Sequence, residues 1–246
     1  MAIPRLADAN AEEIVPPLDW SRETTRVLPR QPRRVAAERL EYHLFRPRKA
    51  HDPLLEHAYE VWRDGWKATL FELDGTTELY SDDFARQDEI AVVAFEGRCV
   101  AVNGLRWLDL SLPRAREDSF FKHWPTPALA RMSDRVVTVG SNTLIHPTWR
   151  GTLIEPPQGK SADPERLAFT TIALTVRRFL SSSAQSLIAL TRNDRAIDRV
   201  LAALGATTLA RIQLHGVETD IICVDRSDAV TETLVVNDLW ARRHQT

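Results

Sequence analysis

Apolar residues recur along the chain with two spacings, one typical of helices and the other typical of strands. Over residues 53–70 they return at every third or fourth position, which predicts a helix. Asp52 is a residue type that caps such a helix, and Pro53 suits its first turn. Shorter apolar or alternating runs predict strands at 40–46, 90–96, 99–108, 136–145, 186–191, 207–214 and 217–224. Further helices are predicted at 165–180, 195–204 and 228–243.

The order of these elements predicts an α/β fold. A hairpin that turns at residues 96–98 is followed by a strand–helix–strand–helix–strand series. Such a series implies a mixed central sheet flanked by helices on both faces. The segment 111–134 is predicted to hold polar loops and a short helix around residues 119–124, and the segment 148–164 is predicted to be a loop. We divide the chain into an N-terminal arm (1–37), one domain (38–225) and a C-terminal helix or tail (226–246).

The predicted arm is rich in proline and arginine, and two interpretations of it stay open. It is either a tail along the domain surface or a docking strip for an acidic partner, such as an acyl carrier protein. Its positive charge comes from Arg26, Arg30, Arg33 and Arg34.

Composition narrows the class of protein. Hydrophobic residues make up 43% of the chain and charged residues 27%, which is typical of a globular domain. The formal net charge of −2 argues against a nucleic-acid partner. No apolar run approaches the roughly 20 residues of a membrane span, and the first residues lack the pattern of a secretory signal. We therefore expect a cytoplasmic protein, with no prediction of its oligomeric state.

The sequence lacks the motifs of metal binding, of nucleotide hydrolysis and of a serine nucleophile, and its two cysteines lie in apolar runs. Cys99 and Cys223 lie in apolar runs, which predicts buried, reduced thiols. No group of His, Cys and Asp has the spacing of a metal site, so we predict no bound metal. Residues 159–161 (Gly-Lys-Ser) resemble the end of a P-loop, but the preceding glycine, Gly151, lies too far upstream. There is no Gly-x-Ser-x-Gly elbow for a serine nucleophile.

Two segments resemble parts of a known superfamily. Residues 139–151, Val-Gly-Ser-Asn-Thr-Leu-Ile-His-Pro-Thr-Trp-Arg-Gly, resemble the central strand and the start of the pyrophosphate loop of GNAT acyltransferases. Residues 187–206 resemble the next strand and helix of that superfamily. Upstream, Trp66, the acidic and aromatic stretch 78–84 and the Gly-Leu-Arg of 104–106 are similar to features of autoinducer synthases and N-acyl amino acid synthases.

The resemblance covers residues 38–225 and implies a GNAT-like fold that uses an acyl thioester, of CoA or of an acyl carrier protein, as co-substrate, with no covalently bound cofactor. The donor-binding residues that it implies are Leu144, Ile145, Arg150, Gly151, Gly159, Lys160 and Asn193. An ordinary surface loop with a few cations is the alternative for residues 150–160. The longer loop departs from the usual closely spaced glycines, and Val200 and Leu201 stand where many GNAT enzymes keep a tyrosine acid.

The candidate catalytic residues are Glu78, Arg106, Ser141, Asn142 and His146. Glu78 could relay a proton from the amine, although acidic loops are usually only solvated. Ser141 and Asn142 could donate to the thioester carbonyl. His146 stands before a proline, so it could equally be a residue that only ends the strand.

Arg106 is the charged residue of a strand that we expect to be buried. A buried arginine needs a partner, and Glu78 or Asp109 could be that partner. Arg106 could instead hold a substrate carboxylate through two parallel hydrogen bonds.

These observations predict an N-acyltransferase in which a small amine or amino acid attacks the thioester directly. A GNAT-like binding or scaffold protein without turnover is the alternative, because the pyrophosphate loop and the tyrosine position both depart from the usual pattern.

Overall fold

The computed structural model describes residues 32–79, 82–195 and 197–245. The helices (α, and η for 3-10 turns) and strands are, in chain order, β1 (Arg34–Ala36), η2 (Ala37–Arg39), β2 (Leu40–Phe45), α1 (Pro53–Asp74), α2 (Asp82–Ala85), β3 (Glu89–Phe95), β4 (Arg98–Asp109), α3 (Pro113–Arg116), η3 (Ser119–Phe121), α4 (Thr126–Ala130), β5 (Val136–Ile145), η4 (Pro147–Trp149), β6 (Leu153–Glu155), β7 (Glu165–Arg166), α5 (Leu167–Leu180), β8 (Ser186–Arg192), η5 (Asn193–Arg195), α6 (Ile197–Ala203), β9 (Ala206–Leu214), β10 (Val217–Asp225), α7 (Leu234–Ala241) and β11 (His244–Gln245).

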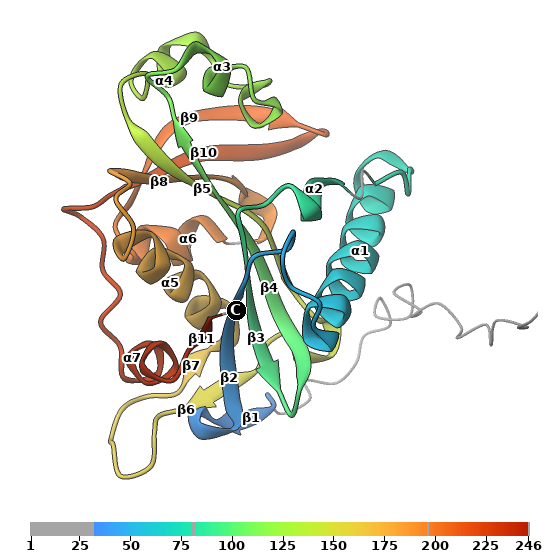
Figure 1. Cartoon of the computed structure of the whole chain (residues 1–246), viewed down its shortest axis with the longest axis vertical. Coiled ribbons are helices and arrows are strands. Elements are labelled where there is room, and N and C mark those ends of the chain that lie inside the picture. Colours follow the sequence, from blue (N-terminus) through green and yellow to red (C-terminus); the bar gives the residue numbers. More distant parts are fainter. Residues whose placement is uncertain (1–31, 80–81, 196, 246) are drawn as a thin grey trace, which may run out of the picture. The chain divides into compact units, whose positions relative to one another are not determined.

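Eight of the strands form one mixed sheet in the order β11-β2-β3-β4-β5-β8-β10-β9. Neighbours are antiparallel except β11 with β2 and β5 with β8, which are parallel. Figure 1 shows α1 on one face of this sheet and α5, α6 and α7 on the other. The predicted α/β fold, with a mixed central sheet and helices on both faces, is therefore confirmed.

Both predicted hairpins close through two-residue turns. Glu96 and Gly97 join β3 to β4, and His215 and Gly216 join β9 to β10, all four with φ between 51° and 72°. Positive φ at both central residues defines the turn whose twist matches that of the flanking strands. Glycine tolerates this conformation, so the sequence pattern located both turns correctly.

Helix α1 begins at the predicted cap. Asp52 Oδ1 accepts a hydrogen bond from Leu54 N (2.8 Å), and Pro53 occupies the first turn. On the buried side of α1, Gly65 lets the helix approach β5 closely, because a Cβ there would lie only 2.3 Å from a methyl carbon of Leu144. The helix therefore lies tightly over the strand that the resemblance identified as central.

Apolar side chains fill the space on each face of the sheet. The buried clusters include Leu174, Phe179 and Leu239 beneath α5 and α7, Trp62, Val92 and Leu144 beneath α1, and Phe121, Trp124 and Val139 beneath α3 and α4. Segments α3, η3 and α4 thus cover the start of β5, on the same face of the sheet as α1 (Figure 1).

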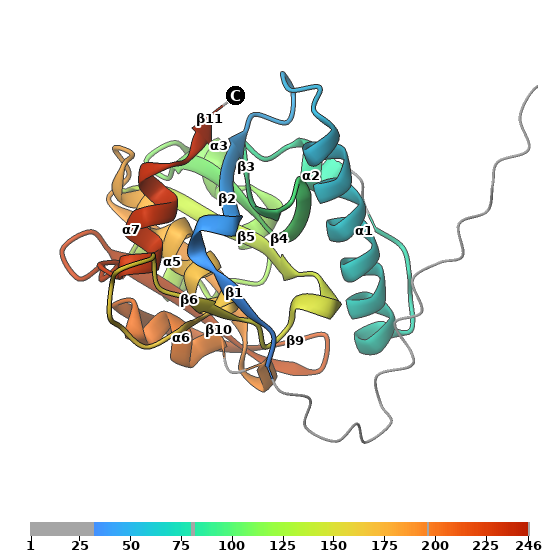
Figure 2. The same ribbon diagram turned by 90° about the horizontal axis from the view of Figure 1, so that it is seen from below.

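Part of the predicted loop 148–164 is a strand. Strand β6 pairs in parallel with β1 and antiparallel with β7, and the three form a second small sheet (Figure 2). Three residues are too few to show an alternating pattern, so β6 could not be predicted from residue spacing. Strand β7 includes Glu165 and Arg166, so the helix predicted from residue 165 begins at Leu167 instead.

The ends of the described chain are also ordered against the core. Strand β1 lies within the predicted arm, and Val235 and Leu239 of α7 are buried in the same cluster as α5. Helix α7 is shorter than the helix predicted over residues 228–243. Helix α6 is shorter than the helix predicted over residues 195–204, and residue 195 belongs to the 3-10 turn η5. None of the helices in the described residues has both the length and the apolar character needed to cross a bilayer.

Candidate functional site

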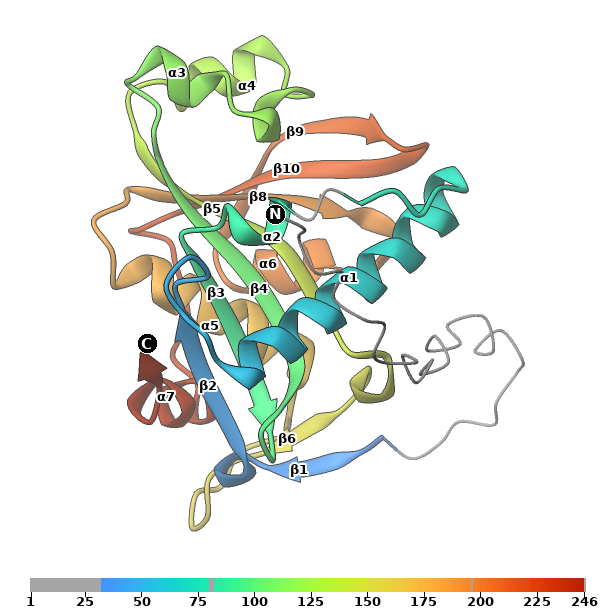
Figure 3. The same cartoon turned by 45° about the vertical axis from the view of Figure 1, so that its right-hand side comes forward.

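Strands β5 and β8, in the middle of the sheet, are hydrogen-bonded over only part of their length. Their pairing joins Val137–Val139 to Ser186–Ile188, and both strands then continue without pairing to each other in the described chain. Burial changes at the same point, since Gly140 and Ala189 are half-buried whereas the paired residues are buried. We call this region, residues 140–145 of β5 and 189–192 of β8, the open seam (Figure 3).

A bulge lies on β5 within the open seam. Asn103 of β4 faces two residues of β5, Asn142 and Thr143, and Asn142 has a φ of 59°. Asparagine adopts this left-handed conformation more readily than most residues. The extra residue of a bulge leaves backbone groups without ladder partners, so Asn142 offers polar groups beside the seam.

A buried polar network links the bulge to β4 and α5. Asn103 Nδ2 donates to Thr175 Oγ1 (2.5 Å), and Thr143 Oγ1 donates to Asn103 Oδ1 (2.8 Å). Thr175 Oγ1 in turn donates to Thr171 O (3.0 Å). Buried polar groups with such complete pairing rigidify a core. This network could not be predicted from the sequence, because single Asn and Thr residues in apolar runs do not reveal their partners.

Ser141 lies on the other face of the sheet from Asn103. Its hydroxyl donates to Gln87 Oε1 (3.2 Å), and Gln87 Nε2 donates to Asp83 O (2.7 Å). Gln87 is buried directly over Gly104, where a Cβ would lie 2.9 Å from the Gln87 amide. The absence of a side chain at Gly104 therefore makes room for the group that orients Ser141.

Arg106 is buried, as expected, and pairs with Asp118. Its Nη1 and Nη2 donate to Asp118 Oδ2 (2.7 Å) and Oδ1 (3.0 Å). Burial acts to raise the pKa of the Asp118 carboxyl, but the hydrogen bonds from Arg106 and from the backbone N–H of Phe120 outweigh it and hold that pKa below its usual value. Arg106 Nε is also buried and has no hydrogen-bond partner among the described residues.

Neither of the partners that we predicted for Arg106 is the observed one. Asp109 accepts hydrogen bonds from Ser111, and Glu78 is an exposed loop residue whose N–H donates to Thr76 Oγ1. Asp118 belongs to the segment that we expected to be a loop, where the sequence pattern gives no contact information. The structure therefore brings Arg106 near Ser141 through cross-strand pairing, but it does not bring Glu78 to Arg106.

His146 ends β5 beside a pocket of about 520 Å³, whose lining includes His57, Arg98 and Trp149. His146 Nδ1 lies 2.9 Å from Thr148 Oγ1 and accepts a longer hydrogen bond from Thr148 N. Burial, followed by the positive charges around it, lowers the pKa of His146. Because Nδ1 accepts from Thr148 N, the neutral form of the ring carries its proton on Nε2.

The guanidinium groups of Arg150 and Arg33 are among the positive charges that lower the pKa of His146. This end of β5 is therefore electropositive, which suits an anionic ligand such as a phosphate.

The predicted donor-loop residues separate into two groups. Arg150 and Gly151 directly precede Thr152, whose carbonyl accepts from Leu167 N at the start of α5. Gly159 and Lys160 instead lie in the connection between β6 and β7. This connection is at one end of the β6–β7 hairpin, and α5 begins at the other end. Only the first group is thus brought to the N-terminus of α5, and all four of these residues are exposed.

The remaining predicted donor residues lie on β5 and after β8. The Leu144 side chain packs beneath α1, and the Ile145 side chain packs on the α5 side of the sheet. Both side chains therefore belong to the core, and only the backbone of these two residues lies along the open seam. Asn193 Nδ2 donates to Glu218 (2.9 Å) and Asp220 (3.2 Å) of β10. Its amide is therefore used within the fold.

Cys99 and Cys223 are both free and buried, which confirms the prediction made from their apolar surroundings. Burial raises the pKa of the Cys99 thiol, and it raises that of Cys223 to about 11. A thiol that stays protonated is a poor nucleophile, so neither cysteine suits an acyl-enzyme intermediate.

No family model matches the sequence, and a search of curated proteins finds no match. Solved structures share the fold. The CoA-dependent acyl-homoserine lactone synthase BjaI, solved with SAM and isopentyl-CoA, is similar with a TM-score of 0.52 and 13% identity, over 84% of this chain and 93% of that chain. FeeM, an N-acyl amino acid synthase from uncultured soil microbes, is similar with a TM-score of 0.53 and 10% identity, over 81% of this chain and 98% of that chain.

These similarities confirm the resemblance in three dimensions. The protein has the GNAT-like fold of the acyl-homoserine lactone synthases and N-acyl amino acid synthases, the two groups that its upstream half suggested. Identities of 10% and 13% establish a shared fold alone.

Proposed function

We propose that this chain is an N-acyltransferase that moves an acyl group from a thioester of CoA or of an acyl carrier protein to the amine of a small molecule or amino acid. The observation that carries the proposal is the open seam, two strand edges that stop pairing beside a bulge at Asn142. The fold shared with BjaI, which was solved with isopentyl-CoA, and with the N-acyl amino acid synthase FeeM supports it.

The open seam suits the pantetheine arm of the donor. Pantetheine is extended and carries amide groups, and an extended ligand can add to a free strand edge through main-chain hydrogen bonds. At the end of β5, Arg150 and the N-terminus of α5 would receive the phosphates, because helix N–H groups and positive charge both attract anions. Helix α5 has no side-chain cap among the described residues, and Leu167 N donates to Thr152 O, so the N–H groups that follow Leu167 would meet the ligand.

The acceptor would lie on the face of the sheet that carries Arg106 and Ser141. The Nε of Arg106 is buried and has no partner among the described residues, so a carboxylate that enters there would give it one, and a guanidinium gains most from anionic oxygens. FeeM, whose acceptor is an amino acid by its description, has the same fold. We therefore propose an amino acid or a similar amine with a carboxylate as the acceptor.

In the reaction, the amine nitrogen attacks the thioester carbonyl carbon. The new C–N bond forms, the C–S bond breaks, sulfur leaves as a thiolate, and the proton lost by nitrogen passes through water to that thiolate. Backbone groups at the bulge, with Ser141 and Asn142, would stabilise the oxyanion that develops on the carbonyl. The raised thiol pKa values of Cys99 and Cys223 favour this direct attack over an acyl-enzyme.

The test is release of free thiol from a panel of acyl-CoA thioesters, each with and without a pool of amino acids and amines. Thiol release that depends on the acceptor, together with the N-acyl product by mass spectrometry, is the expected result. If acyl-CoA and acyl carrier protein thioesters both give no acceptor-dependent release, the proposal is wrong. A stoichiometric acyl group trapped on either cysteine would refute direct attack.

Two substitutions at one position connect the activity to the open seam. A Cβ at Gly140 would lie 3.6 Å from Thr175 Cγ2, an ordinary contact. Gly140→Ala should therefore keep activity, whereas Gly140→Leu should fill the start of the seam and abolish thiol release. Equal thermal stability of the two variants shows that the loss is local, and full activity of Gly140→Leu would contradict the role of the seam.

A binding protein without turnover is the second candidate function. Three observations favour it: His146 Nδ1 is used within the fold, the Asn193 amide is used within the fold, and Arg106 pairs with Asp118 and not with Glu78. Such a protein would be stabilised against heat by acyl-CoA through mass action but would release no thiol. Thermal stabilisation without turnover therefore distinguishes it from the enzyme.

A further inference from the structure

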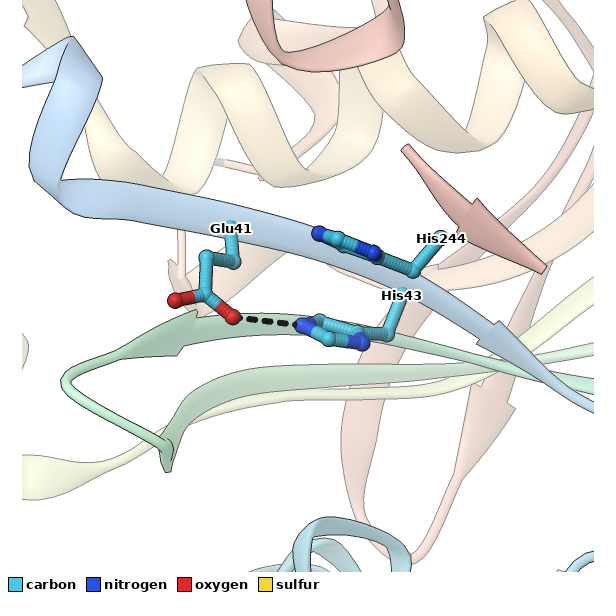
Figure 4. A group of neighbouring side chains, drawn as sticks. All are labelled: Glu41, His43 and His244. Atoms are coloured by element: carbon cyan, nitrogen blue, oxygen red, sulfur yellow. Dashed lines mark hydrogen bonds and ion pairs between the residues drawn. The ribbon is translucent and has the colours of Figure 1, made fainter. Parts of the chain in front are cut away.

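The edge of the large sheet distant from the open seam carries two histidines and a glutamate. Glu41 and His43 are two residues apart on β2, so their side chains lie on the same face. His244 of β11 is paired in register with His43. Figure 4 shows the side chains of Glu41 and His43 from β2 and of His244 from β11 directed toward one another. The fold thus brings Glu41 and His43 of β2 together with His244 of β11, although these two strands are far apart in the sequence.

The three side chains offer ligand atoms at short range. Glu41 Oε2 lies 2.9 Å from His43 Nε2, and the rings of His43 and His244 stack with their centroids 4.5 Å apart. One ligand atom from each residue lies within 4.8 Å of the other two. Bonds of about 2.0–2.2 Å to a zinc ion need a somewhat closer approach, which rotation of the exposed His244 and the partly exposed Glu41 can supply.

We propose that Glu41, His43 and His244 bind a divalent transition-metal ion of the zinc type. Two imidazoles and one carboxylate form a ligand set that zinc accepts, and imidazole also suits cobalt, nickel and copper. The His43 side chain is only 15% exposed and is therefore held in place, while that of Glu41 is 44% exposed. The site is open to solvent on one side, so water would complete the coordination.

The bound ion would fasten β11 to β2. Strand β11 has only two residues and two register pairs with β2, so its backbone pairing alone is weak. A metal that joins segments distant in sequence stabilises the fold, because it restricts a long loop in the unfolded chain. In the strand order, β2 stands three positions from β5, or about 15 Å at 4.7–4.9 Å per strand. The site is thus separate from the open seam.

The direct test is titration of the full chain, produced without a polyhistidine tag, with Zn²⁺ by calorimetry and with Co²⁺ by visible absorption. We expect one ion per chain, a higher melting temperature with Zn²⁺, and reversal of that shift by a chelator. His244→Gln is the main variant, because His244 is exposed and its loss should not disturb folding. Its affinity should fall by roughly 100-fold or more, since even outer-shell partners of a metal contribute 10–100-fold.

Control variants separate this site from other histidines. His51→Gln removes an exposed histidine elsewhere and should leave Zn²⁺ binding unchanged, while His43→Gln and Glu41→Gln should both weaken it. No saturable binding by the wild-type chain, or equal affinity in His244→Gln, would overturn the proposal. Hydrogen exchange in β11 should slow with Zn²⁺ in the wild type only, and no change there would refute the fastening role.

Discussion

Two arginines hold carboxylates on opposite faces of the same sheet, and they differ in how many of their guanidinium nitrogens have hydrogen-bond partners. Arg178 of α5 donates from Nε and Nη2 to Glu89 (2.7 Å each), and from Nη1 to Ser181 (3.0 Å). Arg106 of β4 donates from both Nη atoms to Asp118, while its buried Nε has no partner within the described part of the chain. Every nitrogen of Arg178 is engaged, whereas Arg106 keeps one donor.

The difference indicates different roles for the two pairs. The Arg178–Glu89 pair connects α5 to the start of β3, and the arginine also lies over the Trp107 ring (4.9 Å). This pair is a structural connection between layers. Arg106 lies on the face of β4 that carries the oriented Ser141, next to the open seam. In the proposed function, this Nε is the donor assigned to the carboxylate of the acceptor.

Glu89→Ala is expected to have the largest effect on stability. It removes the partner of an arginine whose side chain is only 17% exposed, and the charge is left uncompensated. Breaking a buried ion pair from one side costs about 3–5 kcal/mol. Urea unfolding of the wild type and the variant measures this difference in the free energy of unfolding.

Glu155→Ala is the matched control for Glu89→Ala. Glu155 pairs with Arg34 at 2.5 Å, but both side chains are substantially exposed. An exposed pair contributes at most about 1 kcal/mol. Equal losses in the two variants would contradict the structural role of the Arg178–Glu89 pair.

The two arginines also show how far the sequence could predict the site. A charged residue inside an apolar strand indicated that Arg106 is buried and needs a partner. Its partner could not be predicted, because Asp118 comes from a segment without periodicity whose position is set by packing against β5. Arg178 lies on a helix beside Arg177, and the pattern alone does not show which of the two turns toward the sheet.

The fold itself was more predictable, because its elements have strong periodic signals. Strand β5 has the predicted bounds, 136–145, and the cap of α1 at Asp52 is confirmed. Short elements such as β6 and β11 were missed, since two or three residues cannot show a period. The histidine and glutamate group at the β2–β11 edge depends on one of these missed strands, so residue spacing could not reveal it.

Arg106→Lys should have the next largest effect: it should lower thermal stability, as Arg178→Lys should, and it should also impair activity. Lysine keeps the charge but loses the planar fork and the Nε donor. If the acceptor carries a carboxylate, its KM should rise roughly 10-fold or more, equivalent to about 1.4 kcal/mol. Steady-state kinetics with an amino acid and with the corresponding amine without a carboxylate would show the rise for the amino acid only.

Arg178→Lys provides the comparison for Arg106→Lys. It should lower thermal stability and leave the KM of the acceptor unchanged, because Arg178 contacts Glu89 and Trp107 on the face of the sheet opposite to Arg106. A similar rise in KM for both variants, or for both kinds of amine in Arg106→Lys, would show that Arg106 acts through the fold alone.

The dependence of stability on pH should differ between the wild type, which has a carboxylate at Asp118, and the variant Asp118→Asn, which has an amide there. The pKa of Asp118 in the folded chain lies below its ordinary value, which is about 3.9 in an unfolded chain. Ionised Asp118 therefore stabilises the fold above that pH, and this contribution is lost as the pH falls through the folded-state pKa. The difference in melting temperature between wild type and Asp118→Asn should be full at pH 6 and smaller at pH 3. A constant difference would contradict the ion pair.

Ser181→Ala should have the smallest effect, and it tests how completely Arg178 is engaged. The Ser181 hydroxyl accepts from Arg178 Nη1 (3.0 Å) and donates to Arg178 O (2.7 Å), both in an exposed setting. Water can replace the lost acceptor there, so we expect a loss of about 0.5–1 kcal/mol in urea unfolding. Ser133→Ala is the matched control, since that hydroxyl also donates to a carbonyl three residues earlier (2.9 Å). A loss in Ser181→Ala as large as that in Glu89→Ala would mean that the carboxylate does not hold Arg178, and the contrast with Arg106 would then fail.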